Sequence, residues 1–349
     1  MKKVLVILSI VAFLLATLVL HILYSGGFFR EIIPKNTASI IQNLRISGAE
    51  DIAISREDNF LIISSDDRAS RRDGRPIQGG LYFVDLTVSP FSSKLLDFSF
   101  NQPFYPHGIS LLKLDSGYQL LVINHVNEKH SIEKFWFNQG VLTHEETLKD
   151  ASMISPNDLV ATSPTSFYFT NDHHYAPGFM RVLEDYLGLQ KSNVVYADGG
   201  AYQEVATGIA YANGINIDTK LQLMFVASPR DFLVKVYQVE PDSQLTFIED
   251  IDAGTGVDNI EFDEEGNIWI GCHPNLLAFS SYAKGKRKYS PSEIIKIVYE
   301  SKGQYEITSV FVDEGENLSS STVAVPHQDK VFVGTVMDEK VMILDSNFP

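Results

Sequence analysis

A polar pair followed by two short apolar strands recurs six times along this chain, and no other feature limits the possible folds so strongly. The pairs begin at residues 50, 107, 157, 213, 258 and 321, so that successive repeats start 45 to 63 residues apart. Beyond residue 40, the apolar residues alternate with polar ones or form short β-branched and aromatic runs between turn residues, which is typical of strands. Units of roughly 40 to 60 residues with several strands each are typical of β-propeller blades. We therefore predict an all-β fold, a six-bladed β-propeller with a few peripheral helices.

Charge and cysteine content exclude several classes of function. The 349 residues include 28 Lys and Arg against 44 Asp and Glu, a net charge of -16, so we expect no nucleic-acid partner. The single cysteine, Cys272, excludes an internal disulfide and a cysteine-cluster zinc site. It stands among apolar residues of a predicted strand, which favours a small buried hydrophobe over a nucleophile.

The first 27 residues form a separate segment in this prediction. Lys2 and its neighbour precede an apolar run from Val4 to Tyr24, which as a helix spans about 31 Å, the thickness of a bilayer core. We therefore predict a signal-anchor or transmembrane segment over residues 1–27 and one propeller domain over 28–349. The positive-inside rule places that domain on the extracytoplasmic side, periplasmic or extracellular, whereas cleavage of the segment would give a secreted protein.

One segment outside the repeats has helical periodicity. Residues 179–189 would place Phe179, Leu183 and Leu187 on one apolar face of a helix. Such a helix either packs over the propeller or forms a lid or membrane contact beside the mouth of the channel.

Equivalent positions of the innermost strands converge on the axis of a propeller, and here most of them carry oxygen ligands. They are Glu50, Asp51, His107, Asn157, Asp158, Asn213, Asp258 and Asn259. Calcium takes about six to eight oxygen ligands, and two carboxylates with three amides would balance its charge without crowding the site with repulsion. The residues that match this description, from four repeats, are Glu50, Asn157, Asn213, Asp258 and Asn259. Because side chains alternate along a strand, Asp51 and Asp158 should point the other way and hold a second, buried ion.

A histidine pair lies on the second repeat. Opposite residues of an antiparallel hairpin have a constant sum of residue numbers, and His107 and His125 are centred on Ser116 in a turn-forming sequence. We therefore predict two imidazoles side by side near the metal, where one takes a proton from water and the other orients or relays from it. The alternative is that His107 only lines the channel and His125 makes a hairpin hydrogen bond.

The same hairpin rule gives neighbours to two of the predicted ligands. It places His273 opposite Asp258, and Asp172 opposite Asn157. Three other histidines are expected at the surface or in loops, namely His130, His144 and His327. The sequence contains no G-x-S-x-G elbow, Gly-rich phosphate loop or H-E-x-x-H motif, so serine-hydrolase and nucleotide chemistry lack support.

The ordered motifs resemble those of the serum paraoxonase/arylesterase family, calcium-dependent six-bladed propeller lactonases and esterases. The motifs, which cover most of the chain after residue 27, are AEDIAIS, YPHGIS, LVINH, PNDLVA, FTNDHHY, YLGL, YANGIN, VDNI and WIGCHPN. The resemblance implies that Glu50, Asn157, Asn213, Asp258 and Asn259 ligate a catalytic calcium, and that Asp51, Asp158 and the carbonyl of Ile109 hold a structural one. It further implies a catalytic dyad of His107 and His125, a substrate wall at Tyr211, and membrane association through the N-terminus and the YLGL helix.

Two departures from the family pattern stand out. Animal members close the ring with a disulfide, whereas this chain must close it by pairing strands from its N- and C-terminal segments. Residues 66–79 fall where the family carries an active-site loop, but they are rich in Arg and lack aromatic residues. The substrate preference of the family is therefore not carried over to this loop.

Together these features predict a membrane-anchored, calcium-dependent hydrolase of lactones and aryl esters that binds two calcium ions. One alternative is a sugar-lactone hydrolase of the related propeller group. The other is a non-enzymatic binding module in which the metal serves only stability.

Overall fold

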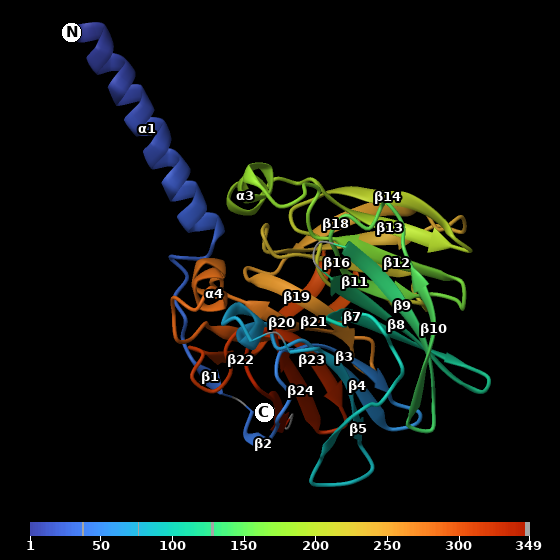
Figure 1. The fold of residues 1–349 in the computed structure, drawn as a ribbon. Helices are drawn as coiled ribbons and strands as arrows, with labels where there is room; N and C mark the ends of the chain where they lie inside the picture. The colour runs from blue at the N-terminus through green and yellow to red at the C-terminus, as the bar shows by residue number, and fades with distance from the viewer. Residues whose placement is uncertain (37, 76, 127–128, 346–349) are drawn as a thin grey trace.

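Each of the six repeats folds into an antiparallel sheet, and the sheets are arranged around one axis as a six-bladed β-propeller, as predicted (Figure 1). The computed structural model describes residues 1–36, 38–75, 77–126 and 129–345. The first blade contains β3 (Ala49–Ser55), β4 (Phe60–Ser65), β5 (Gly80–Asp85) and β6 (Ser93–Leu95). The second contains β7 (Pro106–Leu114), β8 (Gly117–Val126), β9 (Lys129–Asn138) and β10 (Val141–Leu148). The third contains β11 (Pro156–Ala161), β12 (Ser166–Asn171), β13 (Ser192–Asp198) and β14 (Ala201–Ile209).

The remaining blades include β1 (Lys35–Asn36) and β2 (Ile40–Leu44), the two strands that precede the first blade in the sequence. The fourth blade contains β15 (Ile215–Asp218), β16 (Leu223–Ser228), β17 (Leu233–Val239) and β18 (Leu245–Asp252). The fifth contains β19 (Gly256–Phe262), β20 (Ile268–His273), β21 (Ser292–Ser301), β22 (Gln304–Asp313) and, at its outer edge, β1. The sixth contains β23 (Ser321–His327), β24 (Lys330–Thr335), β25 (Val341–Asp345) and β2.

The ring closes through β2, which pairs antiparallel with β25. Leu44 lies opposite Val341 and Ile40 opposite Leu344. The N-terminal strand therefore completes the blade that the C-terminal strands begin. This is the disulfide-free closure expected for a chain with one cysteine.

The second strands are largely apolar because each is covered on both faces. In β4, Phe60 and Ile62 pack with the second blade, whereas Leu61 and Ile63 pack with the sixth. Each of the six hydrophobic clusters likewise lies between two adjacent blades. Burial of apolar side chains between neighbouring sheets thus holds the inner strands around the axis.

A bulge interrupts the innermost strand at the polar pair. In β3, Ala49 lies opposite Ser65 and Ile52 opposite Ile63, so that Glu50 and Asp51 together face one residue of β4. Equivalent register shifts occur in β7, β11, β19 and β23. A bulge bends the strand and redirects its side chains, and here it turns the polar pairs toward the axis.

Close packing of the inner strands depends on glycine. A Cβ atom at Gly108 would lie 2.6 Å from the carbonyl oxygen of Asn157, and one at Gly214 would lie 2.4 Å from that of Asp258. In both cases the contact is with the innermost strand of the next blade. These two positions therefore set the distance between polar pairs of adjacent blades.

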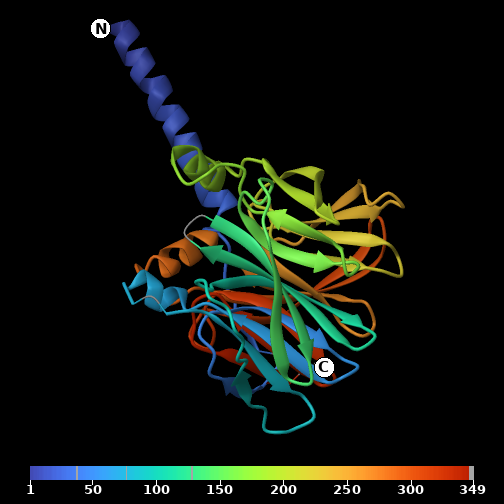
Figure 2. The same cartoon turned by 45° about the vertical axis from the view of Figure 1, so that its right-hand side comes forward.

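Helices lie at one end of the propeller. They are α1 (Lys2–Ser25), α2 (Arg68–Arg72), α3 (Phe179–Leu187) and α4 (Leu276–Ala283). Helix α1 is exposed to solvent along its length and projects from the propeller, and it is long and apolar enough to cross a membrane (Figures 1 and 2). Helix α3 agrees with the helical prediction for residues 179–189. Helix α4 was not predicted, although Asn275 caps it by accepting a hydrogen bond from the Ala278 N–H at 2.9 Å.

Candidate active site

Five oxygen-bearing side chains from four blades lie at the helical end of the channel. They are Glu50 of β3, Asn157 of β11, Asn213 just before β15, and Asp258 and Asn259 of β19, and the least buried of them is 7% exposed. In each, one oxygen is buried and has no hydrogen-bond partner among the described residues: Glu50 Oε2, Asn157 Oδ1, Asn213 Oδ1, Asp258 Oδ1 and Asn259 Oδ1. Buried polar atoms are nearly always paired, so a shared partner is needed here. Two carboxylates and three amides are the donor set that calcium prefers.

The other polar atoms of these side chains are held by neighbours. The amide of Asn157 donates to Asp172 Oδ2 at 3.2 Å, and Nε2 of His273 donates to Asp258 Oδ2 at 2.9 Å. The amide of Asn259 donates to Glu50 Oε1 at 3.1 Å. Each of these contacts uses one polar atom of the side chain and leaves its unpartnered oxygen available to accept from another group.

The sequence predicted these neighbours but not their register. Because of the bulges, His273 lies opposite Gly256 rather than Asp258, and the backbone N–H of Asp172 donates to the carbonyl of Ser155. The constant-sum rule fails at a bulge, which adds a residue to one strand only. The contacts of His273 and Asp172 with the ligand side chains form nevertheless.

Thr322 is a further neighbour that the sequence analysis missed. Its hydroxyl donates to the carbonyl oxygen of Glu50 at 2.7 Å. The sixth repeat thus adds no residue to the predicted ligand set but holds the backbone of Glu50. The sequence feature that pointed to Thr322 was the Ser-Thr pair at the start of the sixth repeat, which matches the pattern of the other repeats only weakly.

A second polar cavity lies further along the channel, lined by Asp51, Asp158 and Glu261. The carboxylate of Asp51 accepts from the backbone N–H of Ile109 at 2.7 Å, and that of Asp158 accepts from the N–H of Ile215 at 2.8 Å. Burial, and then the charges of neighbouring carboxylates, raises the pKa of Asp51 well above its ordinary value. Burial also raises the pKa of Glu261, to about 7. A divalent cation would relieve this repulsion, and the structure brings Asp51, Asp158 and Ile109 together as predicted for one.

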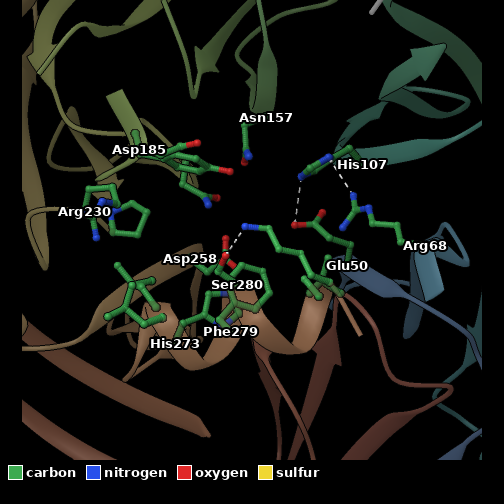
Figure 3. Close-up of a pocket in the computed structure, with 18 of the residues that line it drawn as sticks. Glu50, Arg68, His107, Asn157, Asp185, Arg230, Asp258, His273, Phe279 and Ser280 are labelled. Carbon is green, nitrogen blue, oxygen red and sulfur yellow. Dashed lines mark hydrogen bonds and ion pairs between the residues drawn. The ribbon is translucent and has the colours of Figure 1, made fainter. Parts of the chain in front are cut away.

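The histidine pair lies beside Glu50. Nε2 of His125 is 3.0 Å from Nδ1 of His107, and Nε2 of His107 is 3.3 Å from Oε1 of Glu50. Of the two, only His107 lines the main cavity among the residues described (Figure 3). The two rings are adjacent, as predicted, but they are not directly opposite, because His125 faces Tyr105 across the hairpin.

Two residues that the sequence analysis did not assign complete this cluster. Nδ1 of His130 lies 2.7 Å from Nδ1 of His125, so the expectation that His130 lies at the surface or in a loop was wrong. The same expectation for His327, which is not one of these two residues, was also wrong, because His327 is only 7% exposed. Arg68 of α2 lies 2.9 Å from Nδ1 of His107 (Figure 3). His130 lies directly opposite His125 in the regular pairing of β8 with β9, so the hairpin rule applied to these two strands would have found it. No spacing in the sequence indicates the contact of Arg68.

These contacts determine where the ring protons lie. A guanidinium can only donate, so Nδ1 of His107 accepts from Arg68 and its proton is on Nε2, toward Glu50. Nε2 of His125 also donates to Nδ1 of His107, so that Arg68 and His125 share its one lone pair, and Nδ1 of His125 accepts from His130. Burial, followed by the charges of His107 and His130, lowers the pKa of His125 well below its ordinary value. His125 is therefore neutral at pH 7.

Another imidazole, that of His173, connects the site to α3. Nδ1 of His173 lies 2.6 Å from Asp172 and Nε2 lies 2.8 Å from Asp185. Burial alone would lower the pKa of His173, but the two carboxylates outweigh it and raise the pKa to about 9. The ring also packs against Tyr211, whose φ of 65° is unusual for a bulky residue. Tyr211 lines the cavity, where the sequence predicted a substrate wall.

The main cavity has a volume of about 440 Å³. Besides the polar cluster, its walls are the apolar side chains of α4, among them Leu276, Leu277 and Phe279, and residues of α3 such as Tyr186 (Figure 3). Such a cavity accommodates a small organic molecule whose polar end faces the cluster. The buried Cys272 lies outside its lining, and burial raises the pKa of its thiol well above the ordinary value, so it is not a nucleophile.

The chain is similar to known proteins along most of its length. The family model described as Arylesterase matches residues 8–343. Serum paraoxonase/arylesterase 1 of Homo sapiens is 31% identical over 316 residues, which cover 89% of this chain and 84% of that protein. Serum paraoxonase/arylesterase 2 of Rattus norvegicus is 34% identical over 266 residues, 74% of each chain. A solved gluconolactonase from Xanthomonas campestris has a TM-score of 0.55 at 12% identity, covers 90% of this chain and 97% of its own, and shares the fold.

Proposed function

This chain belongs to the arylesterase family, and from that membership and the geometry of its channel we propose that it is a calcium-dependent hydrolase of lactones and aryl esters. The observation that carries the proposal is the set of five buried, unpartnered oxygens at one end of the channel, beside a histidine pair. Bound there, calcium supplies a Lewis acid that polarises an ester carbonyl and stabilises its oxyanion. Magnesium fits this donor set less well because it retains more water.

Of the two histidines, His107 is the one positioned to accept a proton from the attacking water. It faces the cavity, whereas His125 lies behind it and is neutral. To accept at Nε2, the ring of His107 must carry its proton on Nδ1 and donate it to Nε2 of His125, whose own proton must then be on Nδ1, toward His130. Arg68, which donates to that Nδ1 atom, must then withdraw, so the reactive arrangement includes a different position of the Arg68 side chain.

The second cavity is assigned a structural calcium ion. Asp51 and Asp158 would provide carboxylate oxygens and Ile109 its carbonyl oxygen. Support comes from the burial of both carboxylates, which are 3% and 5% exposed, and from their mutual repulsion. An ion in that position stabilises the channel without contacting substrate.

The N-terminal segment, residues 1–27, is assigned the role of a retained membrane anchor, and residues 28–349 that of the catalytic domain on the extracytoplasmic side. Helix α3 lies beside the last turns of α1, where His21 contacts the carbonyl of Leu187 at 3.3 Å. Phe179, which is 74% exposed, and Val182, at 49%, extend the apolar surface next to the anchor. Residues 179–189 therefore join the membrane contact in this proposal.

Two alternatives from the sequence are less well supported. A propeller that keeps calcium for stability alone has no need of an imidazole pair next to the ligands. A sugar-lactone hydrolase would share the fold with the solved gluconolactonase, but that likeness, at 12% identity, concerns the fold alone.

Hydrolysis assays test the proposal. The full chain in detergent should hydrolyse phenyl acetate and neutral γ- and δ-lactones, lose activity in a chelator and regain it with calcium. The change His107→Gln should lower the rate about 100-fold or more, the usual contribution of a general base, with an unchanged melting temperature. His174→Gln, at an exposed neighbouring histidine, is the control. A chain that hydrolyses none of these substrates with calcium present, or a His107 variant as active as the wild type, contradicts the proposal.

A further inference from the structure

Three cationic side chains line the main cavity of this strongly acidic protein. They are Arg68, Arg230 and Lys284, and the acidic side chains in the same lining are Glu50, Asp185 and Asp258. The whole chain has a net charge of -16, so three cationic side chains in one cavity depart from the acidic character of the rest of the protein.

The acidic groups of the cavity already have counter-charges. Under the proposed function, which this inference takes as its premise, Glu50 and Asp258 are balanced by a divalent cation. Asp185 is paired with His173 at 2.8 Å. None of the three carboxylates is therefore left to balance a cation of the cavity wall.

Arg230 has no carboxylate within ion-pair distance among the residues described. Its guanidinium is partly buried and contacts three neutral oxygens, all at 3.4 Å: the carbonyls of Ser25 and Tyr186 and the hydroxyl of Ser25. Its Nε atom is buried without a partner among the described residues. The charges of Asp185 and Asp231 act on it only from a longer distance. A guanidinium in these surroundings retains donors for an anion, because a partly desolvated charge is costly without one.

Lys284, at the end of α4, also lacks a carboxylate partner among the described residues, although its side chain is exposed. Its amino group donates to the hydroxyl of Ser280 at 2.9 Å. Ser280 and Arg230 both face the cavity, and Figure 3 shows Arg230 on the side away from His107 and Arg68. A molecule with its carbonyl beside His107 would thus direct its other end toward Arg230, and Lys284 belongs to the same lining.

We propose that this cavity selects lactones or esters that carry a carboxylate, which Arg230 and Lys284 bind while the reacting carbonyl lies at the opposite wall beside His107. The apolar side chains Leu276, Leu277 and Phe279 enclose the carbon skeleton between the two ends. Arg68 is not part of this carboxylate site, because it pairs with Asp66 and His107.

A matched pair of substrates tests the proposal. The first is γ-butyrolactone with a carboxylate on the ring carbon next to the ring oxygen, and the second is the same lactone with a primary amide, which has nearly the same shape without the charge. The ratio of their kcat/KM values should favour the carboxylate by about tenfold in the wild type, as expected for one charge-assisted contact. Lys284→Met and Arg230→Gln should each bring the ratio close to one, whereas Lys286→Met, at an exposed residue outside the cavity, should leave it unchanged.

Ligand binding without turnover gives a second measurement. Glutarate, in excess calcium, should raise the melting temperature of the wild type and of Lys286→Met, but not that of Lys284→Met. Arg230 also contacts the ends of α1 and α3, so Arg230→Gln is interpreted only if its melting temperature matches that of the wild type. Lys284 makes no such contact, so Lys284→Met does not need this condition.

The outcomes separate this inference from the proposed function. Hydrolysis of both lactones with equal efficiency, and no effect of glutarate, overturns the carboxylate site and leaves the hydrolase intact. No hydrolysis of either lactone, together with an effect of glutarate that depends on Lys284, overturns the hydrolase and leaves the carboxylate site. If the variants keep the preference but lose binding to phosphatidylglycerol vesicles, the cations bind lipid headgroups and the proposal is wrong.

Discussion

Nε2 of His273 lies 2.9 Å from Oδ2 of Asp258, while Oδ1 of the same carboxylate is buried without a partner among the residues described. The imidazole is itself fixed by stacking on Phe279, with ring centroids 4.2 Å apart and planes 5° from parallel. One oxygen of Asp258 is therefore used to orient the other. This division of roles is how proteins hold a carboxylate ready for a metal ion.

Removal of that hydrogen bond should weaken calcium binding. In His273→Phe the stack on Phe279 is retained while the donor is lost, and the calcium affinity should fall about 10- to 100-fold, as is usual for such supporting contacts. Isothermal titration of metal-free protein with calcium measures this. His144→Phe removes a similar contact, at 2.9 Å to Glu133, away from the channel and should bind calcium like the wild type. Equal affinities in His273→Phe and the wild type would contradict the role given to His273.

Asp51→Asn should remove one of two calcium-binding steps. A ligand that binds only the folded state, present at a free concentration 100 times its dissociation constant, stabilises that state by about 2.7 kcal/mol. Loss of the structural ion should therefore reduce the rise in melting temperature that calcium produces. Differential scanning calorimetry with and without calcium gives that rise. The exposed Asp150→Asn is the control. A titration of Asp51→Asn that still shows two ions would disprove this assignment.

Gly214→Ala should displace two ligands at once. The added Cβ would lie 2.4 Å from the carbonyl oxygen of Asp258 and 2.6 Å from Cα of Asn259. Overpacking of this kind costs about 1 to 3 kcal/mol of the free energy of unfolding, and here it should also lower the calcium affinity. In Gly117→Ala the new Cβ clashes with Trp136 and Phe137, far from the ligands, so this variant should lose stability but keep its affinity. The idea fails if both variants bind calcium equally well.

Stability should fall in alkaline solution as His173 loses its proton. The pKa of His173 is raised from 6.5 to about 9, so its stabilising effect is complete below pH 6.5 and is lost as the pH rises through about 9. The shift corresponds to a contribution on the order of 3 kcal/mol. The groups that face the ring are Asp172, Asp185 and the ring of Tyr211.

Thermal unfolding between pH 6 and pH 10 measures this effect. The melting temperature of the wild type should fall more steeply than that of His173→Gln above pH 8, whereas His174→Gln should follow the wild type. Parallel curves for the wild type and His173→Gln would show that the ring does not titrate in this range.

The repeats allowed the sequence to predict the propeller, because each polar pair is local and the apolar strands behind it have an unambiguous period. The clustering of the five predicted ligand residues followed from equivalence between repeats, and the adjacency of His107 and His125 followed from the hairpin rule. The contact of Arg68 could not be predicted, since it depends on how α2 folds over the channel, whereas the hairpin rule applied to β8 and β9 would have placed His130 opposite His125. Helix α4 was missed because its residues are apolar or small on every side, and only the cap at Asn275 marks its start.

The pairing of β2 with β25 has a consequence for synthesis. Strand β2 leaves the ribosome early, soon after α1 and β1, but its partner is near the C-terminal end of the described chain. Until that partner is made, the sheet edge of β2 is unprotected, and a chain that ends before Val341 would keep it exposed to pairing with other chains. The order in which the strands emerge therefore leaves the ring open until the last blade is complete.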